Sequence, residues 1–400
     1  MKNRVATRFA GVERSATVAL IDQVQSLRAR GVSVLDFGGG DPDFATAAHI
    51  ANAAAAALSE GFTHYTASRG IAPLVAAIAD KLRADNGIAA DPATDVIVTP
   101  SAKHALFATM MTILDPGDEL IVPTPSWVSY QSMAQLAGGI AVAAELDPAD
   151  GFRITRELLE RHATARSKAI LINNPCNPTG RALTDEEADA VAGFARERDL
   201  FVIADEIYEK VLYDGARHIS LAALPGCAER TFTVNGFSKA YAMTGWRLGY
   251  VTGPTDAMKQ MLKVQEHTVS CAGSFVQRGG VAALTGDQRV VAEMVAEYAA
   301  RRALIVAGLE ALPGITCAAP DGTFYVFPDV RGTGFARSAE FAAWLLDEAG
   351  VAVTPGSAFG AGGEGHVRLS FATSRETIAA ALERMAAALA KRPLAAAAAR

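Results

Sequence analysis

The feature that most constrains the fold of this sequence is an alternation of short apolar segments with longer segments of helical spacing, between about residues 50 and 290. Between the short segments lie stretches such as TDEEADAVAGFARERD, in which Thr184 is placed to cap a helix. Alternation of this kind predicts an α/β domain with a mostly parallel sheet and helices on both faces. The short segments, rich in β-branched residues, are 95–100, 118–125, 168–175, 199–208, 230–239 and 246–253.

The last hundred residues follow a different order of elements. A long helical segment at about 287–311 precedes the strand-like TFYVFPDV, and a helix near 338–349 precedes the strand-like VAVTPG and HVRLSFA. This order predicts a smaller α+β domain, which we expect the N-terminal segment to join. The expected division is 1–48 for that N-terminal segment, 49–290 for the large domain, 291–392 for the small domain, and 393–400 for a frayed tail of low complexity.

Composition excludes several classes of partner. A net charge of −6 argues against broad contact with nucleic acid or an anionic membrane, and there is no apolar run of about 18 residues to span one. The four cysteines lie far apart, without CxxC or Cys/His spacing, so we expect no metal site and no disulfide. These features predict a cytoplasmic protein.

Chemistry-bearing residues follow several of the predicted strands. Ligands of open α/β sheets bind beyond the carboxyl ends of the strands, so these residues are the candidates for a site. Ser101-Ala102-Lys103 opens a helical segment, and a helix N-terminus favours phosphate. The segment NNPCNPTG (173–180) offers side-chain amides on a stiff loop.

The next two strands end in an acid and a lysine. Asp205 and Glu206 close an apolar strand and face opposite ways, so only one of them can point into a given cleft, with Tyr208 close behind. Lys239 has no acidic neighbour, and a desolvated lysine is a good amine nucleophile. One cofactor, pyridoxal 5′-phosphate, would use all of these groups. Its phosphate suits the helix N-terminus, its ring nitrogen suits the acid, its phenolic oxygen suits the Asn and Tyr donors, and its aldehyde suits the lysine amine.

Six segments, taken in order, then give a specific resemblance. They are GGGDPDF (38–44), HYTASRG (64–70), NNPCNPTG, ADEIY (204–208), FSKAYAMTGWRLGY (237–250) and HVRLSFA (366–372). From about Ser15 to the last helix the chain resembles the fold-type I pyridoxal phosphate enzymes, in particular the class I aminotransferases of the aspartate aminotransferase family, bacterial subgroup. The resemblance implies a mostly parallel sheet of the seven-stranded type, a smaller α+β domain, and a homodimer.

The resemblance also implies the catalytic roles. Lys239 is expected to form a carbon–nitrogen double bond with the cofactor aldehyde and to move a proton between the substrate Cα and the cofactor. Asp205 is expected to pair with the ring nitrogen, Asn177 and Tyr208 to bond the phenolic oxygen, and Trp127 to stack on the ring.

Phosphate contacts are implied at a second group of residues. The expected phosphate-binding residues are Ser101, Ala102, Lys103, Ser238 and Arg247, with Tyr65 reaching the site of the neighbouring subunit.

The substrate contacts implied by the resemblance are an α-carboxylate site and a side-chain site. Arg368 is expected to grip the α-carboxylate beside Gly40, because a guanidinium binds a carboxylate bidentately. Ser15, Thr17 and Lys103 are similar to residues that seat a distal carboxylate, which favours aspartate or glutamate as the amino donor and a 2-oxo acid such as 2-oxoglutarate as the acceptor.

Four features depart from the pattern of that subgroup. Ser68 and Arg69 replace proline and alanine, and Arg69 is expected either to contact an anion or to face solvent. Cys176 is expected to be a passive small residue, and the unusual segment 266–277 is expected to line the mouth of the pocket.

Other functions remain open at this point. Another amino acid, or prephenate as acceptor, fits the same residues, and so does a pyridoxal phosphate-dependent lyase, cyclase or oxidase of a specialised pathway. A transcription regulator of this fold would carry a DNA-binding domain before residue 15, and a nicotinamide-binding enzyme would need GxGxxG after its first strand; the sequence has neither.

Overall fold

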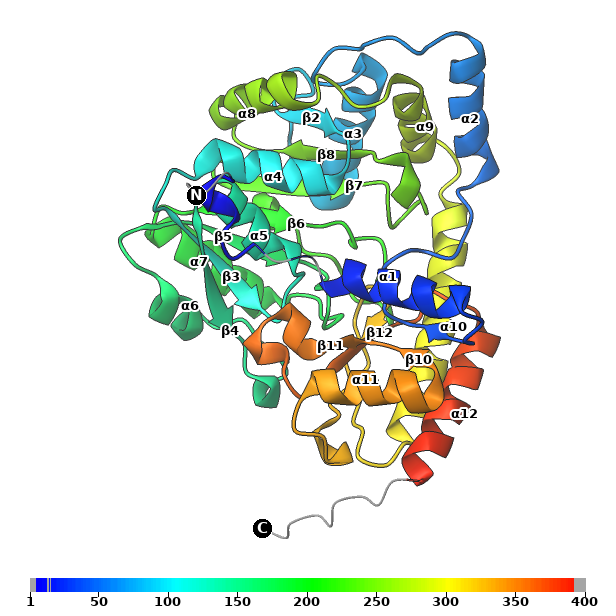
Figure 1. Ribbon diagram of the computed structural model, residues 1–400. Helices are drawn as coiled ribbons and strands as arrows, with labels where there is room; N and C mark the ends of the chain where they lie inside the picture. The colour runs from blue at the N-terminus through cyan, green and yellow to red at the C-terminus, as the bar shows by residue number, and fades with distance from the viewer. Residues whose placement is uncertain (1–4, 13, 15, 392–400) are drawn as a thin grey trace.

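A computed structural model describes residues 5–12, 14 and 16–391, and its largest element is a seven-stranded sheet with the order β2-β8-β7-β6-β5-β3-β4 (Figure 1). The strands from β7 to β4 pair in parallel, and β8 runs antiparallel to both β7 and β2. The predicted mostly parallel sheet is confirmed. Its strands are β2 (Val96–Thr99), β3 (Glu119–Thr124), β4 (Ile140–Glu145), β5 (Ser167–Asn173), β6 (Phe201–Asp205), β7 (Thr231–Gly236) and β8 (Gly249–Thr252).

Helices cover both faces of this sheet because its strands are apolar on both sides. In β5, Leu171 packs into the same core as α4, α5 and α8, whereas Ile172 packs into the core of α6 and α7. A further core beside β2 and β8 is closed by α2, α3 and α9. The helices are α2 (Ala48–Ser59), α3 (Ala72–Asn86), α4 (Ala102–Ile113), α5 (Ser129–Leu136), α6 (Arg156–His162), α7 (Asp185–Glu197), α8 (Thr255–Thr268) and α9 (Ser274–Thr285).

Each apolar segment predicted as a strand contains one, and the expected cap of α7 is present. Thr184 Oγ1 accepts a hydrogen bond from Glu187 N at 3.2 Å, and Glu187 Oε2 accepts one from Thr184 N at 3.0 Å. The prediction missed β4, an alanine-rich strand at the edge of the sheet with mostly accessible side chains. Such a strand lacks the run of buried β-branched residues that marked the others.

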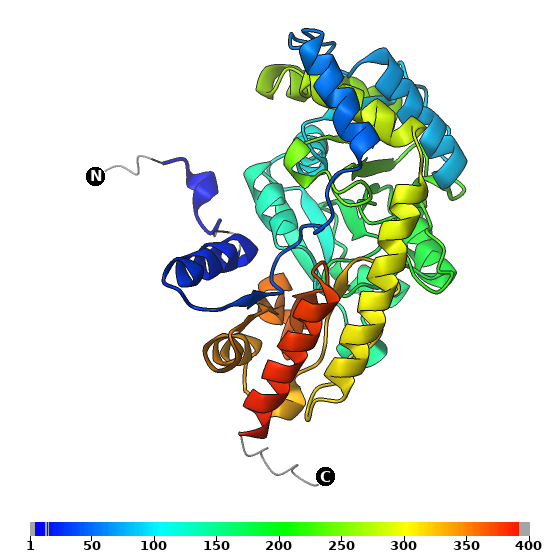
Figure 2. The same ribbon diagram turned by 90° about the vertical axis from the view of Figure 1, so that its right-hand side faces the viewer.

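The C-terminal part is an α+β assembly, as predicted. It contains α10 (Arg289–Glu310), α11 (Ser338–Ala349), α12 (Arg375–Ala390) and a three-stranded antiparallel sheet in the order β11-β12-β9. Figure 2 shows α10 running from the upper to the lower part of the molecule, with α12 beside it. The strands are β9 (Tyr325–Val326), β11 (Thr354–Pro355) and β12 (Val367–Ser370).

The N-terminal segment packs on this C-terminal part. β1 (Leu35–Asp36) pairs in parallel with β10 (Val351–Ala352), and α1 (Ala16–Ala29) contributes Val24 to a small core shared with Leu346 of α11. These contacts support the proposed division of the chain, in which residues 1–48 belong with 291–392. The expected frayed tail, 393–400, lies outside the described residues.

The strand directions bring the ends of distant segments to one edge of the large sheet. The carboxyl ends of β2, β3, β5, β6 and β7 lie there, and β8 begins there because it is antiparallel. In the part of the chain that the structure describes, no helix is both long and apolar enough to cross a membrane.

Candidate active site

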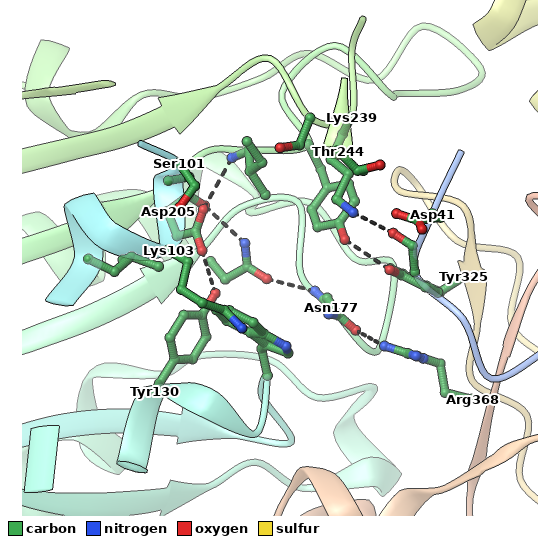
Figure 3. Close-up of a pocket in the computed structure, with 18 of the residues that line it drawn as sticks. Asp41, Ser101, Lys103, Tyr130, Asn177, Asp205, Lys239, Thr244, Tyr325 and Arg368 are labelled. Atoms are coloured by element: carbon green, nitrogen blue, oxygen red, sulfur yellow. Dashed lines mark hydrogen bonds between the residues drawn. The ribbon is translucent and has the colours of Figure 1, made fainter. Parts of the chain in front are cut away.

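A cavity of about 270 Å³ lies at this edge of the sheet, facing β9 and β12 (Figure 3). It brings together residues from both ends of the chain, as Figure 3 shows with Asp205 on one side of the view and Arg368 on the other. The sequence-predicted site residues that line it are Gly40, Ser101, Ala102, Lys103, Trp127, Asn177, Asp205, Tyr208, Ser238, Lys239, Arg247 and Arg368.

Lys239 follows β7 and points its amine across the cavity. Its Nζ donates a hydrogen bond to the carbonyl oxygen of Gly40 and lies 5.9 Å from the ring centroid of Tyr208. Burial lowers the pKa of the Lys239 ammonium to about 8, and the nearby charge of Asp41 only partly opposes this shift. A substantial share of the amine is therefore neutral near physiological pH, as a nucleophile or base requires.

Asp205 ends β6 and is the acid that faces the cavity. Its Oδ2 accepts a hydrogen bond from Tyr130 Oη at 2.7 Å, and its Oδ1 accepts one from Ile207 N at 3.3 Å. Burial raises the pKa of the Asp205 carboxyl to about 6, although both hydrogen bonds act to lower it. No described lysine or arginine forms an ion pair with it, so the site suits a ligand that brings a positive charge.

Glu206, the next residue, faces the other way, as the strand geometry requires. Its Oε2 accepts hydrogen bonds from Ser220 Oγ at 2.8 Å and Asn86 Nδ2 at 3.1 Å and lies 2.9 Å from His218 Nε2. It belongs to a buried polar cluster behind the sheet edge and not to the cavity.

The N-terminus of α4 is suited to an anion. Lys103 and Arg247 both line the cavity there, and neither has a carboxylate partner among the described residues. Burial, together with the charge of Arg247, lowers the pKa of the Lys103 ammonium. Two neighbouring cations at a helix N-terminus make a site for a phosphate group.

Close packing of β8 against α4 builds this site. A Cβ placed on Gly249 would lie 2.3 Å from Ala102 N, so only glycine allows the two backbones to approach. Ser101 caps the helix through an accepted hydrogen bond from His104 N at 3.3 Å, which leaves the first backbone N–H groups of the helix for a ligand.

Arg368, on β12, forms the opposite wall. It is 2 % exposed, and it donates from Nη1 to Asn177 Oδ1 at 2.9 Å and from Nη2 to Gly38 O at 2.7 Å. Its Cζ lies 4.3 Å from the ring centroid of Tyr325 and 5.0 Å from that of Phe359, and its Nε has no partner. A buried guanidinium with free donors and no acid beside it suits a carboxylate ligand.

Two tyrosines complete the site and were not predicted from the sequence. Tyr130 holds Asp205, and the hydroxyl of Tyr325 lies 2.9 Å from that of Tyr208. Both line the cavity. The only sequence signals were their positions three residues after Trp127 and within TFYVFPDV, where a tyrosine is typical of an ordinary core.

One described residue that the sequence predicted for the site does not line the cavity, and two others cannot be compared with it. Tyr65 is 88 % exposed and does not line it within the single chain. Ser15 and the side chain of Thr17 lie outside the described residues.

Two unusual features of the sequence make other contacts within the single chain. Arg69 is half-buried, and its Nη1 donates to the carbonyl oxygens of Thr94 and Val96, each at 2.8 Å. The segment 266–277 does not line the cavity of the single chain.

That segment packs instead against the loop before α3. Ser274 Oγ donates to Phe62 O at 2.9 Å, and Gln277 Oε1 accepts from Ile71 N at 2.8 Å. Cys176 also does not line the cavity.

Comparison with known proteins gives one consistent family. Residues 32–385 match the family model of aminotransferase class I and II. The chain is 49 % identical over 385 residues to an aspartate aminotransferase of Musicola paradisiaca, covering 96 % of each chain. Its structure is similar to the aspartate aminotransferase of Thermus thermophilus with maleate, with a TM-score of 0.92, 41 % identity, and 97 % and 100 % coverage. It is also similar to the aromatic aminotransferase of Pyrococcus horikoshii, with a TM-score of 0.88, 44 % identity, and 92 % and 99 % coverage.

Proposed function

The chain belongs to the class I and II aminotransferase family, and from that membership we propose that it transfers the α-amino group of an acidic amino acid to a 2-oxo acid with bound pyridoxal 5′-phosphate. Enzymes of this family move an amino group between an amino acid and a 2-oxo acid. The identity of the cofactor, the roles of the residues and the substrate are parts of the proposal.

One observation carries the assignment of the cofactor. Three charged sites without ion-pair partners among the described residues line one cavity: the solvent-accessible Lys103–Arg247 pair, the buried Asp205 and the buried Arg368. The cationic pair fits a phosphate, Asp205 fits a protonated ring nitrogen, and Arg368 fits a substrate carboxylate. Lys239 lies on the same cavity with an amine suited to an aldehyde.

When bound, pyridoxal phosphate supplies an aldehyde that exchanges amines and a ring that accepts electrons from the substrate Cα. Asp205, held by the Tyr130 hydroxyl, keeps a proton at the ring nitrogen. With the cofactor bound, Lys239 Nζ would be the base for the proton on the substrate Cα, which its lowered pKa favours. Arg368 fixes the α-carboxylate and so orients the Cα–H bond toward that amine.

The remaining cavity residues position the cofactor. Asn177 and Tyr208, which line the cavity, would bind the phenolic oxygen, and Trp127 would pack on the ring. Ser101, Ala102 and Ser238 complete the phosphate site.

The proposed homodimer and cytoplasmic location are based on features outside the cavity. Tyr65 is proposed to reach the phosphate of a second copy in a homodimer, because its side chain is 88 % exposed in the single chain. A cytoplasmic location is supported by four cysteines that are all unpaired.

Acidic amino acids are the favoured substrates. Lys103 lies at the cavity wall, 4.7 Å from the ring centroid of Trp127, where it can meet a distal carboxylate, with Ser15 and Thr17 as its proposed helpers. The similarity to an aspartate aminotransferase supports this choice. The similarity to an aromatic aminotransferase makes aromatic amino acids the second candidate.

Reduction of the loaded protein tests the site. Pyridoxal phosphate should give the purified protein a visible absorbance band, and borohydride followed by peptide mapping should label Lys239. Lys239→Ala should abolish the band, the label and turnover, because no other amine in the cavity is placed for the aldehyde. Lys259→Ala, at an exposed ion pair with Asp256, is the control and should change none of them.

A substrate screen tests the reaction. Aspartate, glutamate, phenylalanine and tyrosine are offered in turn with 2-oxoglutarate as acceptor. Turnover of aromatic donors without aspartate would contradict the acidic preference. Release of ammonia or peroxide without transfer would favour a lyase or oxidase.

A further inference from the structure

Tyr325 contacts two groups of the site that are assigned to different parts of the ligand. Its hydroxyl lies 2.9 Å from the hydroxyl of Tyr208, and its ring centroid lies 4.3 Å from Cζ of Arg368 (Figure 3). It is 1 % exposed and lines the cavity. One rigid side chain therefore touches both the residue proposed for the phenolic oxygen and the residue proposed for the α-carboxylate.

The surroundings of Tyr325 hold its hydroxyl in place. Its strand pairs with β12, where Tyr325 lies opposite Ser370, and its backbone N donates to Thr323 Oγ1 at 3.1 Å. A Cβ on Gly40 would lie 2.7 Å from Tyr325 Oη, so the absence of a side chain at Gly40 makes room for this hydroxyl. The ring also packs on Phe324, with the centroids 4.8 Å apart.

The hydrogen bond between the two tyrosines uses only one of their two protons. A hydroxyl has one donor and two acceptor positions, so the tyrosine that accepts keeps its own proton for another partner. Among the described residues, Tyr325 Oη has no hydrogen-bond partner other than Tyr208. Tyr208 faces the position proposed for the cofactor's phenolic oxygen, so the favourable arrangement has Tyr325 donating and Tyr208 free to donate into the cavity.

We propose that Tyr325 is a positioning residue for amino-group transfer: its hydroxyl turns the Tyr208 proton into the cavity, and its ring holds the Arg368 guanidinium. The ring acts through cation–π contact on a desolvated guanidinium, whose Cζ also lies 5.0 Å from the ring centroid of Phe359. This inference rests on the proposed function at the same site.

The hydroxyl is tested by Tyr325→Phe in the protein loaded with pyridoxal phosphate. A hydrogen bond donated to the phenolic oxygen lowers the proton affinity of the adjoining nitrogen, and loss of the donor's orientation weakens it. The apparent pKa of the visible absorbance band should therefore rise by about half to one pH unit. KM for the amino donor should stay unchanged, because the ring remains on Arg368.

Tyr213→Phe is the matched control. Tyr213 is buried in the same core and donates to Thr323 O, but it does not line the cavity. The Tyr213→Phe variant should show the same apparent pKa of the visible band as the unmodified protein. A shift for Tyr325→Phe no larger than that of the control would overturn the role of the hydroxyl.

The ring is tested by Tyr325→Leu compared with Tyr325→Phe. Loss of the cation–π contact should raise KM for the amino donor about tenfold relative to the Phe variant. Equal KM values, or a rise already present in the Phe variant, would overturn the role of the ring. If the Leu variant does not fold, the Phe variant still tests the hydroxyl, and a raised KM in the Phe variant would still overturn the role of the ring. If the proposed function itself is wrong, the unmodified protein should show no visible band with pyridoxal phosphate, which distinguishes that outcome from a failure of the role of Tyr325.

Discussion

At the scale of single residues, the cavity holds ionisable groups in states that water would not favour. Burial moves the pKa of the Asp205 carboxyl up to about 6 and that of the Lys239 ammonium down to about 8. Both shifts disfavour the charged form in the protein without ligand, and shifts of this kind are typical of functional sites. The site is therefore organised for a charged ligand at the expense of the stability of the ligand-free protein.

The Asp205→Asn variant tests whether the buried carboxyl lowers the stability of the ligand-free protein. The carboxyl binds its proton more tightly in the folded state, near pH 6, than in the unfolded state, near pH 4, so the stability of the ligand-free protein should fall as the pH rises between these values. The asparagine variant avoids that loss and should be more stable above pH 6 by up to about 3 kcal/mol, with the difference vanishing below pH 4. It should lose turnover, since an amide does not hold the proton at the ring nitrogen.

Thermal unfolding of the ligand-free proteins across pH 4 to 8 measures the difference. Asp256→Asn, at an exposed ion pair, is the surface control and should not reproduce it. An Asp205→Asn variant less stable than the unmodified protein at neutral pH would contradict the argument.

At the scale of elements, the phosphate site depends on how closely β8 approaches the start of α4. The Cα of Gly249 faces the peptide between Ser101 and Ala102, where an added Cβ would lie 2.5 Å from Ser101 C. Because β8 and α4 pack closely, the start of the helix and the side chain of Arg247 line the same cavity. This geometry comes from packing between two elements and not from a single side chain.

Gly249→Ala should push the two elements apart. Overpacking of this kind typically costs 1–3 kcal/mol, so affinity for pyridoxal phosphate should fall about tenfold or more. Gly245→Ala is the matched control, because its added Cβ meets nothing within 4 Å and the residue lies in the short turn Thr244–Trp246 just before Arg247. Titration of the ligand-free variants with the cofactor gives the comparison, and equal affinities would contradict the prediction.

At the scale of the whole molecule, several large apolar and aromatic side chains are exposed in the single chain. Tyr65 is 88 % exposed, Leu58 is 51 % exposed and Val269 is 37 % exposed. The loop that carries Tyr65 packs against the segment 266–277 through Phe62 and Ser274. Large exposed apolar and aromatic side chains of this kind are typical of an interface.

Mixed dimers test the shared site. A Lys239→Ala chain and a Tyr65→Ala chain should each form weak or inactive homodimers. When the two are unfolded and refolded together, a mixed dimer combines the intact Lys239 of one chain with the intact Tyr65 of the other. Such dimers should regain one native site and sediment as dimers. Activity no greater than the sum of the separate variants would show that the sites are not shared.

Much of the architecture was predictable because it is local or follows from topology. The apolar β-branched segments, the capping box at Thr184 and the polar residues after each strand are readable over short stretches. The rule that parallel strands end at one edge of a sheet then placed Ser101, Asp205 and Lys239 together before any contact was known.

Sequence patterns therefore predicted a mostly parallel sheet, six of its seven strands and the chemistry-bearing residues that follow several of them. Only the tertiary structure decided the partners of those residues: Tyr130 on Asp205, Tyr325 between Tyr208 and Arg368, and the backbone carbonyls that hold Arg69. A hydrogen bond or a ring contact between residues that are 25 to 117 positions apart in the chain depends on distances of a few ångströms. Periodicity carries no such information, because it records which face a side chain occupies and not what it meets there.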